Sequence, residues 1–533
     1  MLTRPAALAR PAPRWASSEL AWLSGAAVVL VVLCGLPYIV AALYGPAALE
    51  RPGTFWFGHD FSQYQAAMRE GGAQPGWLIH NHFTAEPHQP AFIYPVYVAA
   101  GKLAAALAVD AIAVFGALEW LGRLTLLASL YAFSATFLDD PRQRRLAVLL
   151  AAGTLGLMAL VAPLRLALEA LHAPWFSEHL PSTINVYLEL NSFGVFLSAP
   201  HLLFGLALTL LVATLYLRRA TGALAAAMLA LSLSHPFNVP VLVCVLVAHA
   251  AWNGRQWWAP AAIAALAGAP MGVYNALLFS REPMWSATYG AQNAMPAPAP
   301  WALPTDFGLV LIAAPLAWRA VLGWPTERRR FALLWIGLGL AWLYAPVPYQ
   351  RRFGFGLQPM LAVLAAVGLW QVSARLHSRA FNYAVVGAAL ATPMLVYMAL
   401  LASAASNSPS EVYLWSRAEA RAARWLSERT TADDVVLAAT EFANPLAGAI
   451  DGRVVHGHVV ATLASPTKQA LVERFFAADT PSPEREALLA ESRATVVAFG
   501  PRERALGATN LAAQAPLEQI YDRDGVQLFR VRR

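Results

Sequence analysis

Long apolar segments recur through the chain, and they constrain its fold more than any other feature. The first, from Leu20 to Ala42, exceeds the roughly 20 residues that a helix needs to cross the hydrocarbon core of a bilayer. Many more segments of this kind follow, separated by short stretches that contain arginine. Helices satisfy their own backbone hydrogen bonds inside a membrane. The pattern therefore predicts a multi-pass α-helical membrane protein.

Composition agrees with this class of protein. The 533 residues are 58% hydrophobic and 13% charged, with a mean hydropathy of +0.49, far from the balance of a soluble globular chain. The net charge of +7 reports arginine placement and hence orientation, so nucleic acid is not expected as a partner. Cys34 and Cys244 both lie inside apolar runs, which indicates neither a disulfide framework nor a thiolate zinc site.

The arginines set the predicted orientation, because cytoplasmic loops carry the excess of positive charge. Arg4, Arg10 and Arg14 place the N-terminus in the cytoplasm, and the first segment is interpreted as an uncleaved anchor. Keeping the later arginine clusters inside gives about 11 spans and puts everything after residue 405 outside. These spans are expected near residues 20–42, 111–138, 146–164, 196–217, 224–252 (crossing twice), 260–279, 307–321, 331–346, 355–372 and 383–402.

Polar residues within or beside these spans mark candidate cavity positions. The region 224–252 is interrupted by His235-Pro236-Phe237-Asn238, and irregular backbone at membrane depth usually borders protein or water. His235 and Asn238 are therefore expected to line a cavity. Glu119 and Arg123 lie four residues apart in one span and are expected to neutralise each other. Further candidates that enter a span from the outer side are Glu189, Asn191 and His201.

The loop between Tyr44 and Pro90 concentrates the acids and histidines that the spans lack. They are His59, Asp60, Glu70, His80, His82, Glu86 and His88. An unpaired carboxylate in hydrocarbon is costly, so this cluster belongs where water or a polar ligand reaches it. The orientation places the loop outside. The segment 91–109 that follows is expected to be a helix in the outer interface, with Lys102 in its middle.

Each loop residue also has a structural interpretation. Asp60 could cap a helix at 61–69, which is compatible with catalysis. Glu86 could be a loop acid with no task. His80, His82 and His88 have a spacing that could bind zinc, but the loose ligand set favours a metal-free loop, and no metal site is predicted.

Arg351 and Arg352 lie in a short loop that the topology places on the outer face, against the positive-inside rule. Guanidinium groups suit bidentate contact with phosphate, so the pair suggests a bound anion. The alternatives are contact with lipid headgroups or with the carboxylates of the large outer loop.

Residues 406–533 change to a charged, globular pattern of one small extracytoplasmic α/β domain, while residues 1–405 form the transmembrane domain. Helices are expected at 411–428, 466–476 and 483–489, and strands at 434–439, 495–499, 519–521 and 526–531. No nucleotide fingerprint follows any of these strands. Glu441, His456 and His458 follow predicted strand ends, and a structural role is favoured for all three.

An acidic outer loop, an outer arginine pair and an interfacial helix together suit a lipid-linked donor held at the membrane surface. The carboxylate would deprotonate an acceptor hydroxyl, the arginines would hold the phosphate leaving group, and the helix would guide the lipid. A transporter or flippase of a lipid-linked or anionic substrate is the alternative, since the His235-Pro236 break suits it. A non-catalytic scaffold would leave the acid and histidine cluster unexplained.

The layout resembles the polyprenyl-phosphate-dependent glycosyltransferases of the GT-C fold, the class of protein O-mannosyltransferases and lipid A aminoarabinose transferases. The matching pieces are Gly58-His59-Asp60-Phe61 early in the first outer loop, Thr84-Ala85-Glu86-Pro87 before the interfacial helix, and the C-terminal outer domain. The chain departs from the family in having His59-Asp60 instead of two acids flanking one residue. That departure argues against a two-carboxylate metal site, and a divalent cation is left open.

The resemblance implies roles for individual residues. Asp60 would be the catalytic base, and Glu86 a second carboxylate that orients the acceptor or the donor sugar. Lys102, Arg351 and Arg352 would contact the donor phosphate. Candidate cavity-lining residues are His59, His82, His88, His235, Asn238 and Glu189. The expected reaction is an inverting transfer of a sugar from a polyprenyl phosphate to a lipid, glycan or protein on the outer face of a bacterial cytoplasmic membrane.

Overall fold

The computed structural model describes residues 15–44, 49–50, 58–157, 187–404, 415–511 and 516–532. The chain divides into two compact units. The first unit comprises Met1–Leu36, Leu118–Asn275 and Ala294–Leu401, and the second comprises Pro37–Ala117, Ala276–Asn293 and Ala402–Arg533. The predictions made for Arg4, Arg10 and Arg14, and for the end of the span at 146–164, lie outside the described residues.

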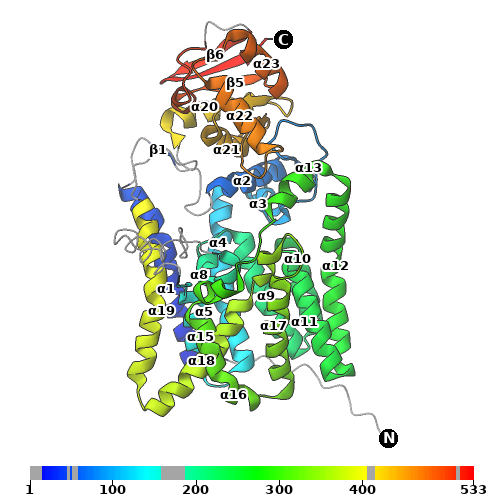
Figure 1. Cartoon of the computed structure of the whole chain (residues 1–533), viewed down its shortest axis with the longest axis vertical. Helices are drawn as coiled ribbons and strands as arrows, with labels where there is room; N and C mark the ends of the chain where they lie inside the picture. Colours follow the sequence, from blue (N-terminus) through cyan, green and yellow to red (C-terminus); the bar gives the residue numbers. More distant parts are fainter. Residues whose placement is uncertain are drawn as a thin grey trace. The chain divides into compact units, whose positions relative to one another are not determined.

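The first unit is built of helices (Figure 1). In chain order they are α1 (Ser17–Tyr44), α4 (Ala111–Phe137), α5 (Pro141–Gly153), η1 (Leu188–Leu190), α8 (Ser192–Phe196), α9 (Pro200–Arg218), α10 (Thr221–Ser234), α11 (Asn238–Asn253), η2 (Arg255–Trp257), α12 (Trp258–Arg281), η4 (Pro300–Ala302), α14 (Leu303–Phe307), α15 (Leu309–Ala313), η5 (Ala314–Ala317), α16 (Trp318–Leu322), α17 (Thr326–Leu343), η6 (Gln350–Gly354), α18 (Leu357–Leu376) and α19 (Arg379–Ala404). Helices α1, α4, α12 and α19 run on into residues of the second unit.

Within the described residues, five helical stretches are long and apolar enough to cross a membrane. They are Ser17–Tyr44, Ala111–Phe137, Pro200–Arg218, Arg255–Arg281 and Gln350–Leu376. A pair bent by 103°, Pro300–Phe307 with Leu309–Leu322, would make a sixth. The chain is thus a helical membrane protein, and the count of about 11 spans stays a prediction.

Helix α18 lies at the centre of the first unit, and 89% of its most apolar 18-residue stretch is buried. It packs against α5, α15 and η5. The approach to η5 is close at Gly368, where a Cβ would lie 2.7 Å from the Cβ of Leu316 and 2.8 Å from the oxygen of Ala313. A glycine is therefore required where these two segments meet.

Two predictions from the apolar segments are confirmed in this unit. The break expected at His235-Pro236-Phe237 separates α10, which ends at Ser234, from α11, which begins at Asn238. Arg123 also lies 3.5 Å from the Glu119 carboxylate one turn earlier on α4, so the two charges offset each other. The Arg123 guanidinium donates a further hydrogen bond of 2.8 Å to the carbonyl of Phe196.

The second unit begins with α2 (Gly58–Ala73) and α3 (Pro95–Leu107), which pack face to face. A Cβ on Gly101 of α3 would lie 1.8 Å from the carbonyl oxygen of Met68 on α2, so the helices touch through backbone. Segment 91–109 was expected to be one helix, but only its central part, α3, is helical. Its outward side exposes Leu103 and Leu107.

A five-stranded sheet forms the other part of the second unit, with strand order β4-β3-β5-β7-β6. Its strands are β3 (Val435–Leu437), β4 (Arg453–Val454), β5 (Val496–Phe499), β6 (Leu517–Arg523) and β7 (Val526–Val531). Strands β4, β3 and β5 are parallel, and β7 pairs antiparallel with β5 and β6. The expected hairpin at Asp524-Gly525 joins β6 to β7.

Successive side chains of a strand point to opposite faces of the sheet. Helices pack against the side chains on each of these two faces (Figure 1). Val496 and Ala498 of β5 pack with α20 (Arg417–Ser427) and α21 (Thr440–Ala449). Val497 and Phe499 pack with α22 (Ser465–Phe476) and α23 (Ser482–Ser492). The remaining short elements are α13 (Pro283–Trp285), η3 (Ser286–Gly290), α24 (Pro501–Ala505), β1 (Leu49–Glu50) and β2 (Trp415–Ser416).

The first loop completes the edge of this sheet. Thr84 forms an isolated bridge with His456, and the backbone N–H of Val454 donates to the carbonyl of His82. Strand β4 is the terminal strand of the sheet, so these contacts cover an edge that would otherwise expose unpaired backbone groups. The loop and the C-terminal segment therefore fold together within one unit.

Candidate functional site

Asp60 accepts hydrogen bonds on one carboxylate oxygen from three side chains of the second unit. Its Oδ1 lies 3.1 Å from Nε2 of His458, 3.2 Å from Nε2 of Gln292 and 3.4 Å from Nε2 of Gln63. Gln63 is on α2, Gln292 follows η3, and His458 follows β4. The fold thus gathers around one carboxylate three groups that are far apart in the sequence.

Tyr94 orients the two glutamines. Its hydroxyl lies 3.1 Å from Oε1 of Gln63 and 3.4 Å from Oε1 of Gln292, which leaves both amide nitrogens directed at Asp60. Tyr94 has a left-handed backbone with φ 55°, an uncommon conformation for an aromatic residue. Strained backbone of this kind is often retained where it positions a functional group.

His458 has its tautomer fixed by the backbone. Its Nδ1 accepts hydrogen bonds from the N–H groups of Val460 at 3.2 Å and Ala461 at 3.1 Å. A nitrogen that accepts carries no proton, so Nε2 carries it and donates to Asp60, and the Gln63 amide nitrogen 3.3 Å from Nε2 is a second donor to Oδ1 rather than a partner of Nε2. The rings of His59 and Phe83 lie edge-on to the imidazole. Burial lowers the pKa of His59, which favours the neutral form of the His59 ring.

Asp60 lies inside the first turn of α2, which begins at Gly58, so the alternative of an N-cap at Asp60 is wrong. The positive end of a helix and three hydrogen-bond donors stabilise a carboxylate. The side chain is 29% exposed and thus within reach of a substrate. This arrangement can hold a carboxylate in one orientation to accept a proton from a hydroxyl.

Glu86 is engaged with the C-terminal segment. Its Oε2 lies 2.5 Å from Nζ of Lys468 and accepts a hydrogen bond from the Thr84 hydroxyl. Burial alone would raise the pKa of Glu86, but the hydrogen bonds from Lys468 and Thr84 lower it below its usual value. Glu86 is therefore an ionised group that joins the loop to α22.

The remaining loop histidines have partners of their own. His80 and His82 contact the carboxylate of Glu70 at 2.7 and 3.1 Å, and His88 contacts the carbonyl of Glu86. Burial would raise the pKa of Glu70, but its hydrogen bonds with His80 and His82 lower it to about 2. Among the described residues no group of three or more His, Cys, Asp and Glu side chains could hold a metal ion.

Lys102 donates hydrogen bonds to the carbonyls of Gly71 at 3.2 Å and Gln74 at 2.7 Å. These carbonyls lie at the C-terminal end of α2, where a cation is favourable. The ammonium also lies 5.4 Å from the centre of the Trp77 ring. Lys102 therefore caps α2, and because an ammonium carries three donors, contact with a phosphate remains compatible with that role.

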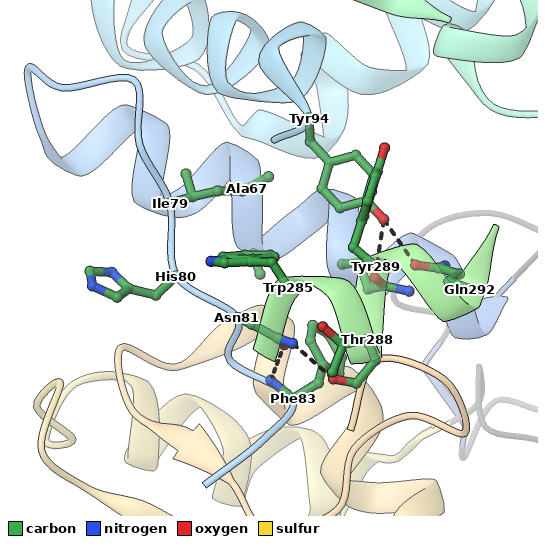
Figure 2. A pocket seen from close by; sticks show the side chains of 13 residues that line it. Ala67, Ile79, His80, Asn81, Phe83, Tyr94, Trp285, Thr288, Tyr289 and Gln292 are labelled. Atoms are coloured by element: carbon green, nitrogen blue, oxygen red, sulfur yellow. Dashed lines mark hydrogen bonds between the residues drawn. The ribbon is translucent and has the colours of Figure 1, made fainter. Parts of the chain in front are cut away.

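A small pocket borders the group that surrounds Asp60 (Figure 2). Gln63, Tyr94 and Gln292 belong both to its wall and to the hydrogen-bond network of Asp60. Figure 2 shows the ring of Tyr289 beside that of Tyr94, and the two ring centres are 5.4 Å apart. The other lining residues are Ala66, Ala67, Ile79, His80, Asn81, Phe83, Trp285, Thr288 and Ala461.

In the first unit, Glu189 binds both arginines of the predicted pair. Its two carboxylate oxygens lie 3.1 Å from Nε of Arg351 and 3.0 Å from Nη1 of Arg352. Aromatic rings face the same guanidinium groups, Tyr187 against Arg351 and Phe237 against Arg352. Glu189 is 4% exposed, so the two cations share one buried carboxylate. The carboxylate that meets the arginines belongs to η1 and not to the large outer loop.

The helix break in the same unit places His235 and Asn238 in buried positions. The His235 ring stacks on Phe355 at 4.5 Å, and neither of its nitrogens has a hydrogen-bond partner among the described residues. The Asn238 amide nitrogen donates a hydrogen bond of 2.7 Å to the Thr209 hydroxyl. Asn238 and Phe355 also line a second small pocket, within the first unit.

Sequence reasoning missed Gln63, Gln292 and Tyr94, and it favoured a structural role for His458. Gln63 had a usable signal, because it lies one helical turn after Asp60. Gln292 and His458 had none, since only the tertiary fold brings segments more than 200 residues away to α2.

No profile of a known protein family and no curated protein matches the sequence. Solved structures do match, and they define the class: the chain has the GT-C fold of membrane glycosyltransferases. One is the oligosaccharyltransferase of Archaeoglobus fulgidus tethered to an acceptor peptide, with a TM-score of 0.52 and 13% identity over 91% of this chain and 69% of that one. Another is the arabinofuranosyltransferase AftD of mycobacteria, with a TM-score of 0.52 and 15% identity over 96% of this chain and 40% of that one.

Proposed function

We propose that this protein is a membrane glycosyltransferase that moves a sugar from a polyprenyl-phosphate carrier to an acceptor hydroxyl. The observation that carries the proposal is the Asp60 carboxylate, held by three hydrogen-bond donors at a partly exposed position in a GT-C fold. A carboxylate held in this way is ready to accept a proton from an acceptor hydroxyl.

Asp60 acts as the general base in this proposal. Removing the proton of the acceptor hydroxyl as it attacks the anomeric carbon makes the oxygen a better nucleophile. Attack from the face opposite the departing phosphate inverts the configuration at that carbon. Glu86 is the second carboxylate of this proposal and orients the acceptor or the donor sugar. Its ion pair with Lys468 fixes the loop that carries it.

Arg351 and Arg352 bind the phosphate of the donor in this proposal. Glu189 already engages both guanidinium groups with its two oxygens, which is the kind of contact that two oxygens of a phosphate would make. Stabilising the negative charge of the departing polyprenyl phosphate lowers the barrier to transfer. Lys102 is a further proposed phosphate contact.

The lipid part of the donor is assigned to the bilayer beside α3. Leu103 and Leu107 are 46% and 60% exposed on the outward side of this helix, which suits an interface between water and lipid. We place the reaction on the outer face of a bacterial cytoplasmic membrane, with about 11 spans and the segment after residue 405 outside. The acceptor is a lipid, glycan or protein of the cell envelope.

The proposal is tested with the purified full chain in liposomes. Radiolabelled pentoses and hexoses on polyprenyl phosphate are offered together with envelope membranes as the acceptor source, and nucleotide-linked sugars serve as the comparison. We expect covalent transfer from a lipid-linked donor only. Movement of the labelled lipid across the bilayer without a new covalent product would establish the transporter alternative instead.

A further inference from the structure

We propose that His458 is a positioning residue that holds the Asp60 carboxylate in place. The segment that follows β4 would then contribute directly to the site around Asp60. The inference rests on the proposed role of Asp60 as the base. His458 is 5% exposed, and its Nε2 lies 3.1 Å from Oδ1 of the carboxylate. It is the only one of the three donors to Oδ1 that comes from the C-terminal α/β segment.

The imidazole can donate to Asp60 but is poorly placed to receive its proton. Two backbone N–H groups, those of Val460 and Ala461, already point at Nδ1. Placing a proton on Nδ1 would turn both hydrogen bonds into repulsive contacts and leave two donors unpaired. The proton taken from the acceptor therefore stays with Asp60, and His458 holds the carboxylate that receives it.

The turn that carries His458 is itself fixed. The N–H groups of Gly457 and His458 donate to the Thr462 hydroxyl at 3.2 and 3.0 Å. That hydroxyl donates in turn to the carbonyl of Phe83, at 2.7 Å. The turn is thus tied to the first loop independently of the contact between His458 and Asp60.

A second tie runs through Asn444 on α21. Its Nδ2 donates to the carbonyls of Gly457 at 2.8 Å and His59 at 3.2 Å, and its Oδ1 accepts from the Ser62 hydroxyl at 2.9 Å. His59 and Ser62 are close neighbours of Asp60 on α2. Asn444 therefore sets the spacing between α2 and the His458 turn, and a donor is held at a constant distance from the carboxylate.

Two substitutions at one position separate a positioning role from a structural one. His458→Phe keeps a ring but removes the donor, whereas His458→Gln keeps an N–H group where Nε2 lies. Val459→Ala is the matched control, because Val459 is adjacent and 63% exposed. All variants are made in the full chain in liposomes, and transfer is measured from the radiolabelled polyprenyl-phosphate sugars used above.

We expect His458→Phe to lower kcat by roughly 10- to 100-fold, the effect of losing one hydrogen bond to a charged group. The KM values for donor and acceptor should stay close to those of the control, because the residue does not contact substrate. His458→Gln should recover most of kcat. Activity of His458→Phe equal to that of Val459→Ala, or equal losses in the Phe and Gln variants, would overturn the proposal.

The contact is also tested without any assay of transfer. Thermal unfolding of Asp60→Asn, His458→Phe and the double variant forms a cycle that isolates the coupling between the two residues. We expect the double variant to lose clearly less in Tm than the two single losses combined. Additive losses would overturn the positioning role even if transfer were observed, whereas full transfer by Asp60→Asn would instead remove the base on which the proposed function rests.

Discussion

Lys468 and Glu86 form an ion pair that joins α22 to the loop leading away from Asp60, with Nζ 2.5 Å from Oε2. The Lys468 side chain is 12% exposed, so its charge is largely removed from water. Burial lowers the pKa of Lys468, and the hydrogen bond with Glu86 opposes that effect. Lys468 depends on this pair, because without Glu86 it would be a largely buried charge without its carboxylate partner.

We therefore expect Lys468→Met to destabilise the chain by about 1.5–3 kcal/mol, the range for a hydrogen bond to a charged group. Chemical denaturation of the purified full chain measures this change. Gln469→Ala, an exposed position next to it on α22, is the control and should change stability little. A Lys468→Met variant as stable as the control would show that the pair contributes nothing.

The Glu70 cluster predicts a dependence of stability on pH. The folded-state pKa of Glu70 is about 2, below its ordinary value of 4.5, because His80 and His82 hydrogen-bond its carboxylate. A depressed carboxyl pKa stabilises the fold above the unfolded value, and this contribution is lost as pH falls from about 4.5 to about 2.

Glu70→Gln should accordingly lower the free energy of unfolding at pH 6 by at most about 3 kcal/mol. The difference in stability between wild type and variant should shrink as the pH falls from about 4.5 to about 2, because the Glu70 carboxyl becomes protonated over this range. A stability difference that stays constant between these two pH values would contradict the assignment of the pKa shift to this carboxylate.

The arginine pair predicts a selective effect on the donor. Arg351→Ala removes one of the two guanidinium groups that Glu189 engages. We expect it to raise the KM for the polyprenyl-phosphate donor by roughly 10-fold or more, since hydrogen bonds to charged groups are of that strength. The KM for the acceptor should change little, and unchanged dependence on the donor would remove Arg351 from phosphate binding.

Glu189→Gln is the paired variant for that experiment. It keeps the shape of the side chain but removes the carboxylate that pairs with both arginines, so the variant should be less stable than wild type in the absence of donor. Added polyprenyl phosphate should then raise its Tm more than it raises that of wild type, because the lipid phosphate supplies the missing charge. Equal Tm increments in the two proteins would count against a phosphate at this position.

The sequence predicted the helical membrane class because apolar segment length and arginine placement are local properties that one chain displays directly. The break at His235-Pro236-Phe237 and the charge pair Glu119–Arg123 followed from proline geometry and from helical spacing. In the C-terminal segment, β5 and the β6–β7 hairpin lie where alternation and turn residues indicated. Helix α21 was missed because Pro445 interrupts its pattern.

The site could be predicted only in part. Asp60 was found because an acid is conspicuous beside apolar spans, but its partners on other segments carry no mark of their contact. His458 looks in the sequence like any polar residue after a strand, and only the fold shows that it meets Asp60. Glu189 was recognised as a polar residue entering a span, but its pairing with Arg351 and Arg352 depends on tertiary contacts between η1 and η6.

The most direct test of the account is sugar transfer by Asp60→Asn in the reconstituted full chain, with Asp60→Glu and wild type measured in parallel. Asparagine keeps the size of the side chain and loses the ability to take up a proton. We predict that transfer from the polyprenyl-phosphate donor is abolished in Asp60→Asn while the variant is still expressed and folded, with only the modest loss of Tm expected from weakening the hydrogen bonds to the carboxylate. Transfer by Asp60→Asn at the wild-type rate would contradict the account, because the proton of the acceptor would then leave without this carboxylate.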